Sequence, residues 1–391
     1  MARRRSARSS ATSSPRPVCR PKSTTSERAP ALKTSLPDFP WDSLAEDKAL
    51  AAAHPDGIVD LSVGTPVDPI APAVRAALAG PAADEPGYPT THGPASLRSA
   101  IAGSLLRRFG VTVDPVAVLP TIGSKELVAW LPTLLGVGAG DTVVIPELAY
   151  PTYEVGARIA GAAFLRSDGL TAVGPARVPL VWVNSPSNPT GRVLPPEHLR
   201  KVVTWARERG AVVASDECYL SLSDGAVSVL HPDVCGGSHE GLLAVHSMSK
   251  SSGLAGYRAG FVTGDPVLVA GLLEVRKHAG MIVPRPVQAA MEAAASDDGH
   301  VTAQAAVYAA RRGRLRVALE KAGLRVDHSE AGLYLWATAG KRSRLTVREF
   351  ATQGVLVAPG EFYGPAGAQH VRVAVTATDE RIDAAVARLS P

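Results

Sequence analysis

Residues 242–250, LLAVHSMSK, join four apolar residues to a polar cluster that ends in Lys250. The same arrangement occurs twice upstream, where LVWV at 180–183 precedes NSPSNPTG and AVVA at 211–214 precedes SDECY. Near-continuous apolar runs of this length predict strands that are buried on both faces, as in a mostly parallel sheet. Ligands of such sheets bind beyond the carboxyl ends of the strands. The three polar clusters therefore predict one shared site.

The flanking sequence extends this pattern to an α/β architecture. Helix-like segments at 125–135 and 197–209 alternate with strand-like runs at 143–146 and 259–262. The second helical segment stops at Gly210, a residue that favours the end of a helix. This alternation predicts a sheet whose faces are covered by helices.

The sequence beyond about residue 266 has a different pattern. Two long helix-like stretches, 267–280 and 301–322, precede strand-like runs at 332–336 and 371–375. This order predicts a second, smaller α+β domain, and a chain of 391 residues exceeds the roughly 250–300 residues that one core usually supports. We expect four parts: a disordered basic tail at 1–36, an N-terminal arm and part of the small domain at 37–70, the large domain at 71–280, and the small C-terminal domain at 281–391.

The positive charge of the chain is concentrated in its first 36 residues. They contain nine Lys or Arg and one Glu, a net charge of +8, so residues 37–391 carry −3 of the total of +5. The segment is rich in Ser, Pro and Arg and has no apolar periodicity, so we expect it to be disordered. It is interpreted as a floppy tail or a misplaced start, with an electrostatic tether to an anion as the alternative. The mildly acidic remainder gives no reason to expect nucleic acid as a partner.

The composition also predicts the compartment. No stretch approaches the roughly 18 uninterrupted apolar residues of a membrane span, and the N-terminal segment lacks the apolar core of a secretory signal. The three cysteines, Cys19, Cys218 and Cys235, form no pair with the spacing of metal ligands. We therefore expect no membrane contact, no metal site and a reduced, cytoplasmic setting. Cys218, which lies beside a polar cluster, is expected to be a small core residue.

Further motifs accompany the three clusters along the chain. They are Tyr88-Pro89 with Gly93 and Leu97-Arg98, Gly123-Ser124-Lys125-Glu126, Tyr150-Pro151-x-Tyr153, and Gly256-Tyr257-Arg258-Ala259-Gly260. From about residue 37 to its end the chain resembles the fold-type I, class I and II aminotransferases. The resemblance implies an α/β fold of that type, with pyridoxal 5'-phosphate bound by the large domain. It also implies an enzyme that moves amino groups between amino acids and 2-oxo acids.

The resemblance assigns cofactor chemistry to the clusters at the strand ends. Lys250 would carry the cofactor as a Schiff base and move a proton between the substrate α-carbon and the cofactor. Asp216 would keep the pyridine nitrogen protonated, since a buried carboxylate without a cation is costly. Asn188 and Tyr219 would donate to the phenolate oxygen of the cofactor, which lowers the pKa of the Schiff base.

The cofactor phosphate is expected at the start of a helix. Gly123, Ser124 and Lys125 open that helix and offer backbone N–H groups to an anion. Ser247 and Arg258 would add a hydroxyl and a guanidinium. A lone Gly-Ser-Lys is no phosphate-binding motif by itself, so this assignment depends on the resemblance.

The resemblance also assigns residues to the ring and to the substrate. Tyr150 would stack on the pyridine ring, with core packing as the alternative. Tyr88 would reach the phosphate of a neighbouring subunit, which would make the active form a homodimer. Arg372 would hold the substrate α-carboxylate with both arms of its guanidinium, beside Asn188. Gly64 would let the backbone approach the same carboxylate.

Within this family the chain is most similar to the actinobacterial N-succinyldiaminopimelate aminotransferases. The stretches that carry this similarity are FPWD at 39–42, DLSVGTP at 60–66, PELAY at 146–150 and APGEFYG at 358–364. The similarity implies a step of lysine and diaminopimelate biosynthesis. In that step N-succinyl-LL-2,6-diaminopimelate and 2-oxoglutarate are interconverted with N-succinyl-2-amino-6-oxopimelate and glutamate.

The residues leave recognition of the distal end of the substrate open. Strict aspartate enzymes of one subgroup have an arginine just ahead of the segment that corresponds to 284–286, whereas residues 278–281 of this chain are HAGM. The candidate contacts for a distant carboxylate, although residues of this kind are more often surface charges, are Arg192, Lys277, His278 and Arg285. Aminotransferases for aspartate, aromatic amino acids or kynurenine, and a C–S lyase on the same fold, remain alternatives. A non-enzymatic regulator of this fold needs an N-terminal DNA-binding domain, for which 36 residues are too few.

Overall fold

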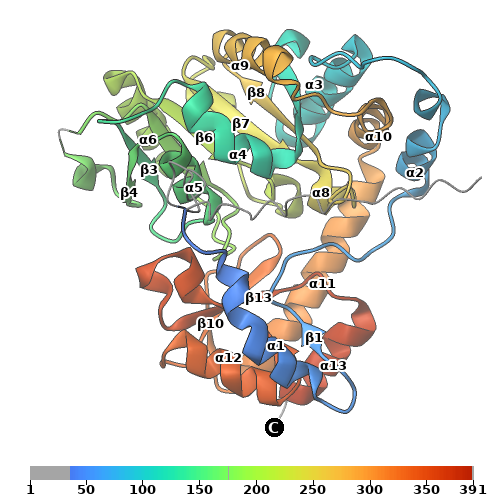
Figure 1. Cartoon of the computed structure of the whole chain (residues 1–391), viewed down its shortest axis with the longest axis vertical. Coiled ribbons are helices and arrows are strands. Elements are labelled where there is room, and N and C mark those ends of the chain that lie inside the picture. The colour runs from blue at the N-terminus through green and yellow to red at the C-terminus, as the bar shows by residue number, and fades with distance from the viewer. Residues whose placement is uncertain (1–35, 175, 390–391) are drawn as a thin grey trace, which may run out of the picture. The chain divides into compact units, whose positions relative to one another are not determined.

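The computed structural model describes residues 36–174 and 176–389, so the predicted tail lies outside the described residues except for Leu36. The described chain has a central sheet of seven strands in the order β2-β8-β7-β6-β5-β3-β4 (Figure 1). Its strands are β2 (Val118–Ile122), β3 (Thr142–Ile145), β4 (Ala163–Arg166), β5 (Leu180–Asn184), β6 (Val212–Asp216), β7 (Leu242–Ser247) and β8 (Ala259–Gly264). Only β8 runs antiparallel to its neighbours, which confirms the predicted mostly parallel sheet.

Helices cover both faces of this sheet because successive residues of its strands point to opposite sides. In β7, Leu242 and Ala244 belong to one apolar cluster, and Leu243 and Val245 belong to another. The first cluster includes residues of α3 (Ala95–Phe109), α6 (Pro196–Arg209) and α10 (Arg285–Ser296). The second includes residues of α4 (Gly123–Leu134), α5 (Thr152–Ile159) and α9 (Pro266–Ala279).

A second, antiparallel sheet lies below the first in Figure 1 and has the strand order β12-β13-β10-β9. Its strands are β9 (Arg325–Asp327), β10 (Tyr334–Thr338), β12 (Ala358–Pro359) and β13 (His370–Ala374). A separate apolar cluster joins this sheet to α11 (Gly299–Lys321), α12 (Ser343–Thr352) and α13 (Asp379–Leu389). The sequence beyond residue 300 therefore has the predicted α+β character.

The N-terminal arm returns to this second part of the chain. After a short 3-10 turn (Pro40–Leu44) and α1 (Ala45–Ala52), β1 (Val59–Asp60) pairs in parallel with β11 (Val355–Leu356). The chain then crosses to α2 (Pro72–Leu78), which packs on α10. As a result, residues 60–65 lie between the two sheets, where the strand ends of the larger sheet meet the smaller one.

We propose that the limit between the two parts lies later in the chain than residue 281. Val287, Met291 and Ala294 of α10 are buried in a core cluster of the seven-stranded sheet, although the small domain was expected from residue 281. The next helix, α11, has 23 residues and is about 35 Å long, and it extends from the upper to the lower part of Figure 1. We therefore propose a domain limit within α11.

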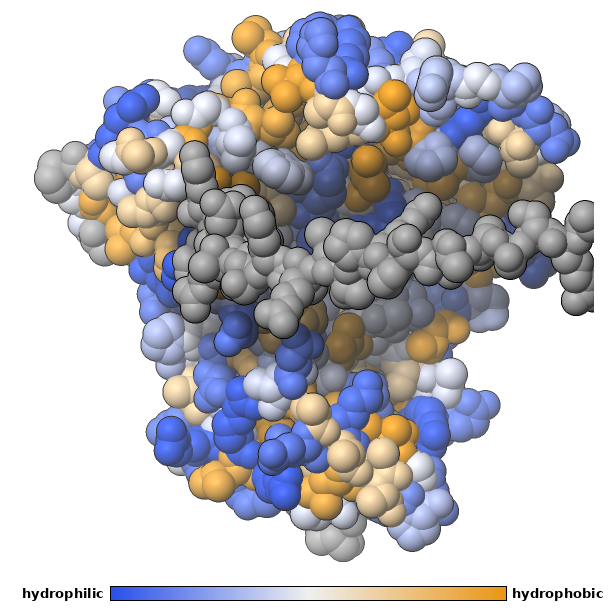
Figure 2. Space-filling view, viewed as in Figure 1, coloured by the Kyte–Doolittle hydropathy of each residue, from blue (hydrophilic) through white to orange (hydrophobic). Residues whose placement is uncertain are grey.

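Within the described ranges, no helix combines the length and the apolar character that crossing a membrane requires. The same ranges hold no group of three or more His, Cys, Asp or Glu side chains arranged to bind a metal ion. Figure 2 shows a recess on one face of the molecule, between the upper and lower parts, with hydrophobic and hydrophilic residues around it.

Candidate active site

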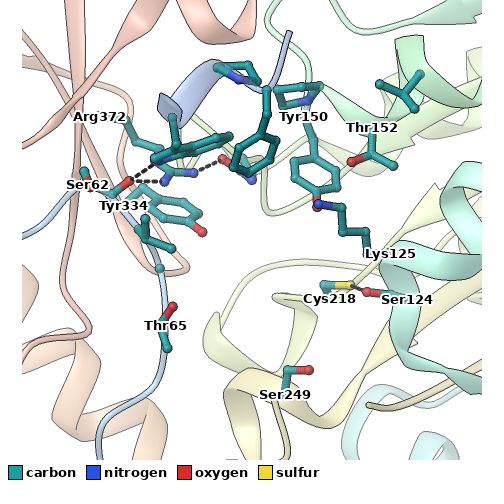
Figure 3. A pocket seen from close by; sticks show the side chains of 18 of the residues that line it. Ser62, Thr65, Ser124, Lys125, Tyr150, Thr152, Cys218, Ser249, Tyr334 and Arg372 are labelled. Atoms are coloured by element: carbon teal, nitrogen blue, oxygen red, sulfur yellow. Dashed lines mark hydrogen bonds between the residues drawn. The ribbon is translucent and has the colours of Figure 1, made fainter. Parts of the chain in front are cut away.

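A partly open cavity of about 740 Å³ lies between the carboxyl ends of the large-sheet strands, the second sheet and the N-terminal arm. All but two of the predicted site residues line it. They are Gly64, Ser124, Lys125, Tyr150, Asn188, Asp216, Tyr219, Ser247, Lys250, Arg258 and Arg372. Figure 3 shows several of these side chains, which come from segments far apart in the sequence and face the same space.

Lys250 lies in the short helix α8 (Met248–Ser251), directly after β7. Its Nζ donates a 2.7 Å hydrogen bond to the carbonyl oxygen of Gly64. Burial lowers the pKa of the Lys250 ammonium, and the nearby guanidinium groups of Arg372 and Arg258 act in the same direction. A larger neutral fraction makes the amine a better nucleophile, because only the unprotonated nitrogen can attack a carbonyl.

Asp216 ends β6 as a buried carboxylate. Its Oδ2 accepts a 2.8 Å hydrogen bond from the Tyr153 hydroxyl, and its Oδ1 accepts a 3.2 Å bond from the backbone N–H of Cys218. Burial raises the pKa of Asp216, and among the described residues no Lys or Arg forms an ion pair with it. The carboxylate therefore fits a cationic partner from outside the chain, such as a protonated pyridine nitrogen.

An anion site is formed where α4 begins. Gly123 has a φ of 71°, and a Cβ there would overlap the guanidinium of Arg258, so glycine allows the two to approach. Arg258 donates a 2.8 Å hydrogen bond to the carbonyl oxygen of Ala255 and has no carboxylate partner among the described residues. Ser124 and Ser247 line the adjoining wall of the cavity. A helix N-terminus, an arginine and two hydroxyls suit a phosphate dianion.

The side chain of Lys125 lies outside this anion site. Its Nζ is 5.6 Å from the centroid of the Phe39 ring, and in Figure 3 the side chain extends toward Tyr150. Only the backbone N–H of Lys125 lies at the helix start, and this N–H group is the part of the residue that the sequence analysis assigned to the anion. The ammonium instead faces the mouth of the cavity.

Arg372, on β13, is a buried cation with 2% of its surface exposed. Its Nη1 donates to Oδ1 of Asn188 at 2.9 Å, its Nη2 donates to the carbonyl oxygen of Ser62 at 2.7 Å, and its Nε has no hydrogen-bond partner (Figure 3). Its guanidinium carbon lies 4.0 Å from the ring centroid of Tyr334 and 5.0 Å from that of Tyr363. A buried guanidinium without a carboxylate among the described residues is suited to bind one from a ligand.

A hydrogen-bonded link fixes the two strand ends beside these groups. The Nδ2 of Asn184 donates to the carbonyl oxygen of Asp216 at 2.8 Å, and its Oδ1 accepts from the backbone N–H of Asn188 at 2.7 Å. Because Oδ1 of Asn188 accepts from Arg372, the amide N–H groups of Asn188 point elsewhere and can donate to a ligand. The residues predicted to contact the cofactor and the substrate thus share one hydrogen-bonded network.

Two predicted residues do not line the cavity. Gly123 lies behind it, where it contacts Arg258 as described above. Tyr88 is 94% exposed, and its carbonyl oxygen accepts a hydrogen bond from Arg285. Tyr88 therefore takes no part in the cavity of its own chain.

None of the four cations considered for a distant carboxylate lines the cavity. Arg192 is 4.0 Å from Asp168, Lys277 pairs with Glu274 on α9, and Arg285 pairs with Glu85. His278 is likewise outside the cavity, at the exposed end of α9. The cations at the mouth are instead Lys48 and Lys125.

The sequence did not assign roles to several residues that the structure brings into the site. Tyr153 holds Asp216, Tyr334 packs on Arg372, and Phe39 and Trp41 of the arm line the mouth. A signal was present for Tyr153, which belongs to the motif Tyr150-Pro151-x-Tyr153 that accompanies the polar clusters. Phe39 and Trp41 belong to the stretch FPWD at 39–42, which carried only the family similarity, and the sequence analysis did not single out Tyr334.

Comparisons with known proteins give a consistent result. A family model described as aminotransferase class I and II matches residues 56–389. The chain is 64% identical to a probable aminotransferase of Mycobacterium tuberculosis, over 92% of this chain and 86% of that protein. It is 59% identical to the 4-dedimethylamino-4-oxo-anhydrotetracycline transaminase OxyQ of Streptomyces rimosus, over 91% and 99% of the two chains. It is 30% identical to an LL-diaminopimelate aminotransferase of Dehalococcoides mccartyi, over 91% and 96%. The crystal structure of an aminotransferase from Neisseria meningitidis has a TM-score of 0.82 and 29% identity, over 90% and 96%.

Proposed function

Since the chain belongs to the class I and II aminotransferases, which depend on pyridoxal phosphate, we propose that it interconverts N-succinyl-LL-2,6-diaminopimelate and 2-oxoglutarate with N-succinyl-2-amino-6-oxopimelate and glutamate. The reaction is a step of lysine and diaminopimelate biosynthesis. We assign it to the cytoplasm because Cys218 and Cys235 are free thiols, as is usual in a reducing compartment.

The residues of the cavity divide the work of the reaction. When bound, the cofactor supplies an aldehyde and an electron-withdrawing ring. Lys250 would hold it covalently through Nζ, and the amine of Lys250, once free, would take the proton from the substrate α-carbon. Asp216 would keep a proton on the ring nitrogen, and the start of α4 with Arg258 and Ser247 would hold the phosphate.

The substrate half of the cavity is organised around Arg372, which holds the carboxylate next to the reacting amine. Asn188 and the carbonyl oxygen of Ser62 fix the guanidinium of Arg372. Both substrates can therefore bind to it through their α-carboxylates. In N-succinyldiaminopimelate two further carboxylates lie at the far end of a long arm. The arm must therefore extend toward the mouth, and cations are needed there.

The observation that carries this proposal is the ammonium of Lys125 at the mouth. Among the described residues it has no carboxylate partner, and its Nζ lies over the Phe39 ring. Lys48, across the mouth, has only a 3.8 Å contact to Asp60, whose carboxylate also accepts from Ser62. Asp38 is the other exposed carboxylate of the lining. The charges of the two lysines therefore balance those of Asp38 and Asp60. The two lysines suit the two carboxylates of the succinylated arm.

We expect Lys125→Met to lower kcat/KM for N-succinyldiaminopimelate about fivefold and to leave the glutamate half-reaction within twofold of the unmodified enzyme. The size corresponds to about 1 kcal/mol for one exposed charge pair. The double variant Lys48→Met with Lys125→Met should lose more. Lys277→Met, which removes a paired lysine outside the cavity, is the matched control. An equal loss for both substrates would show that Lys125 does not bind the arm.

The substrate assignment itself is tested by comparing kcat/KM for N-succinyldiaminopimelate with that for aspartate, kynurenine and aromatic amino acids. A preference for any of the latter would show that the enzyme is an aminotransferase of another pathway. Release of a thiol from cystathionine-like substrates would indicate a C–S lyase. This panel does not depend on the lysine variants.

A second candidate function is amination of a polycyclic ketone. It is favoured by the 59% identity to OxyQ and by the aromatic mouth, where Phe39 is 53% exposed and its ring centroid lies 5.5 Å from that of Trp41. Apolar rings at a mouth suit a flat, fused-ring substrate. A 4-oxo-anhydrotetracycline therefore belongs in the same panel, and a higher kcat/KM for it than for the succinylated substrate would select this function.

We further propose that the active form is a homodimer in which Tyr88 completes the phosphate site of the other subunit. Its 94% exposure, at a position that the family uses for the cofactor, supports this. The holoenzyme should sediment at twice the chain mass of 40.5 kDa. Tyr88→Phe should weaken cofactor affinity by roughly tenfold, the loss of about one hydrogen bond to an anion, without changing this mass. A fully active monomer would remove Tyr88 from the site.

A further inference from the structure

Tyr334 is the first residue of β10 and is 3% exposed at the inner end of the cavity. In the antiparallel register of β10 and β13, Tyr334 faces Ala374, and Trp336 faces Arg372. Residues two apart on a strand point to the same side, so Tyr334 and Arg372 are diagonal neighbours on one face of the sheet. The second sheet thus places an aromatic ring and the carboxylate-binding arginine together.

The ring of Tyr334 is the aromatic surface closest to the guanidinium. The distance from the ring centroid to the guanidinium carbon of Arg372 is 4.0 Å, against 5.0 Å for Tyr363 and 5.8 Å for Trp41. Such a contact holds the guanidinium parallel to its neighbour and stabilises its charge where water is excluded. Tyr334 therefore helps to set the plane in which Arg372 presents its two N–H groups.

The hydroxyl of Tyr334 contacts the other half of the site. Its oxygen lies 3.1 Å from the hydroxyl oxygen of Tyr219, and the two rings meet edge to face at 5.7 Å. This is the one hydrogen bond that either hydroxyl makes among the described residues. Burial raises the pKa of Tyr219 well above its usual value, so Tyr219 keeps its proton.

The same hydroxyl also explains the glycine at position 64. A Cβ on Gly64 would overlap the hydroxyl oxygen of Tyr334, so any larger residue would displace it. The carbonyl oxygen of Gly64 accepts from Nζ of Lys250. One side chain therefore lies against the Lys250 contact, Tyr219 and Arg372.

We propose that Tyr334 is a positioning residue that joins the two halves of the site: its ring sets the plane of Arg372, and its hydroxyl donates to Tyr219. Only one proton can lie between the two oxygens. When Tyr334 supplies it, the proton of Tyr219 is free to point into the cavity, toward the phenolate oxygen of the cofactor. The inference rests on the proposed roles of Tyr219 and Arg372, and it is independent of which amino donor the enzyme prefers.

The two roles of Tyr334 can be separated with two variants of the holoenzyme. Tyr334→Phe keeps the ring and removes the hydroxyl. Weaker donation from Tyr219 should then raise, by about 0.5 to 1 pH unit, the midpoint of the pH-dependent change in the visible spectrum of the lysine-bound cofactor. The KM for the amino donor should stay within twofold, because the ring still packs on Arg372. Tyr334→Leu removes both contacts and should raise this KM about tenfold as well.

Tyr257→Phe is the matched control, since this half-exposed tyrosine lies outside the cavity, and it should titrate and turn over as the unmodified enzyme does. Kinetics use whichever amino donor the unmodified enzyme accepts, so a wrong substrate assignment leaves the test intact. A Tyr334→Phe enzyme with an unshifted midpoint would overturn the hydroxyl role. A Tyr334→Leu enzyme with an unchanged KM would overturn the ring role. If the leucine variant does not fold, the phenylalanine variant alone decides the hydroxyl role.

Discussion

A Lys250→Ala enzyme is expected to lose transamination by at least about four orders of magnitude in kcat. Lys250 is asked to do two things, to hold the cofactor covalently and to take the proton from the substrate α-carbon. General base catalysis alone contributes on the order of 10² to 10⁴, and the loss of the covalent link adds to it. The two other lysines that line the cavity in the described part of the chain, Lys48 and Lys125, lie at its mouth and cannot replace Lys250.

This expectation is checked in three measurements. Single-turnover kinetics give the rate of each half-reaction, and borohydride reduction followed by peptide mapping should place the cofactor on Lys250 of the unmodified enzyme alone. Thermal unfolding should show that the variant is folded. Lys250→Arg keeps the positive charge but cannot form the link, so it should be as inactive as the alanine variant. Turnover of Lys250→Ala at the unmodified rate would contradict the assignment.

The strands that carry the site could be predicted because each is central in the sheet and buried on both faces. Runs such as 242–245 are apolar throughout, and the polar cluster that follows marks the strand end. The two edge strands had no such signal. β2 contains Pro120, which an edge strand tolerates and a central strand does not, and β4 is partly exposed along its whole length.

The domain limit could not be predicted from periodicity. Helical periodicity shows that a helix has an apolar side, but it does not show which sheet that side contacts. The small, apolar residues of α10, such as Ala290 and Ala294, fit against the large sheet as well as they would fit a separate domain. The limit became visible only when the core clusters were known.

Some residues of the site could likewise be predicted from the sequence, and others could not. Asp216 ends β6 and Lys250 lies in the short helix after β7, so a local pattern was enough to predict that both lie at strand ends. The sequence alone did not predict the direction of the Lys125 side chain. Successive residues of a helix are rotated by about 100°, so Lys125 and Ser124 point in different directions, and only the fold shows what each of them faces. Tyr334 and Phe39 reach the cavity from a strand and an arm far away in the sequence, where only the tertiary fold brings them together.

Arg372→Ala is expected to lower kcat/KM on the order of 10² for the amino donor and for the 2-oxo acid alike. Both substrates present their α-carboxylates to the same guanidinium, and the loss corresponds to about 3 kcal/mol for a bidentate, charge-assisted contact. Arg372→Lys should recover little, because a point charge does not reproduce the planar fork. Arg192→Ala, outside the cavity, is the control and should leave both half-reactions unchanged.

The structure also predicts that this loss of function is not a loss of stability. Arg372 is a buried cation without an anion among the described residues, and its Nε has no partner, so its two hydrogen bonds and its ring contacts offset only part of its desolvation cost. Arg372→Met, an apolar side chain of similar length, should therefore change the free energy of unfolding by less than about 1 kcal/mol or increase it, while activity falls as in the alanine variant. A large drop in Tm would mean that Arg372 serves the fold through Asn188 and Ser62. A drop for one substrate only would mean that the other carboxylate binds elsewhere. The buried guanidinium of Arg372 destabilises the fold, and we explain its presence by the substrate carboxylate that it is proposed to bind.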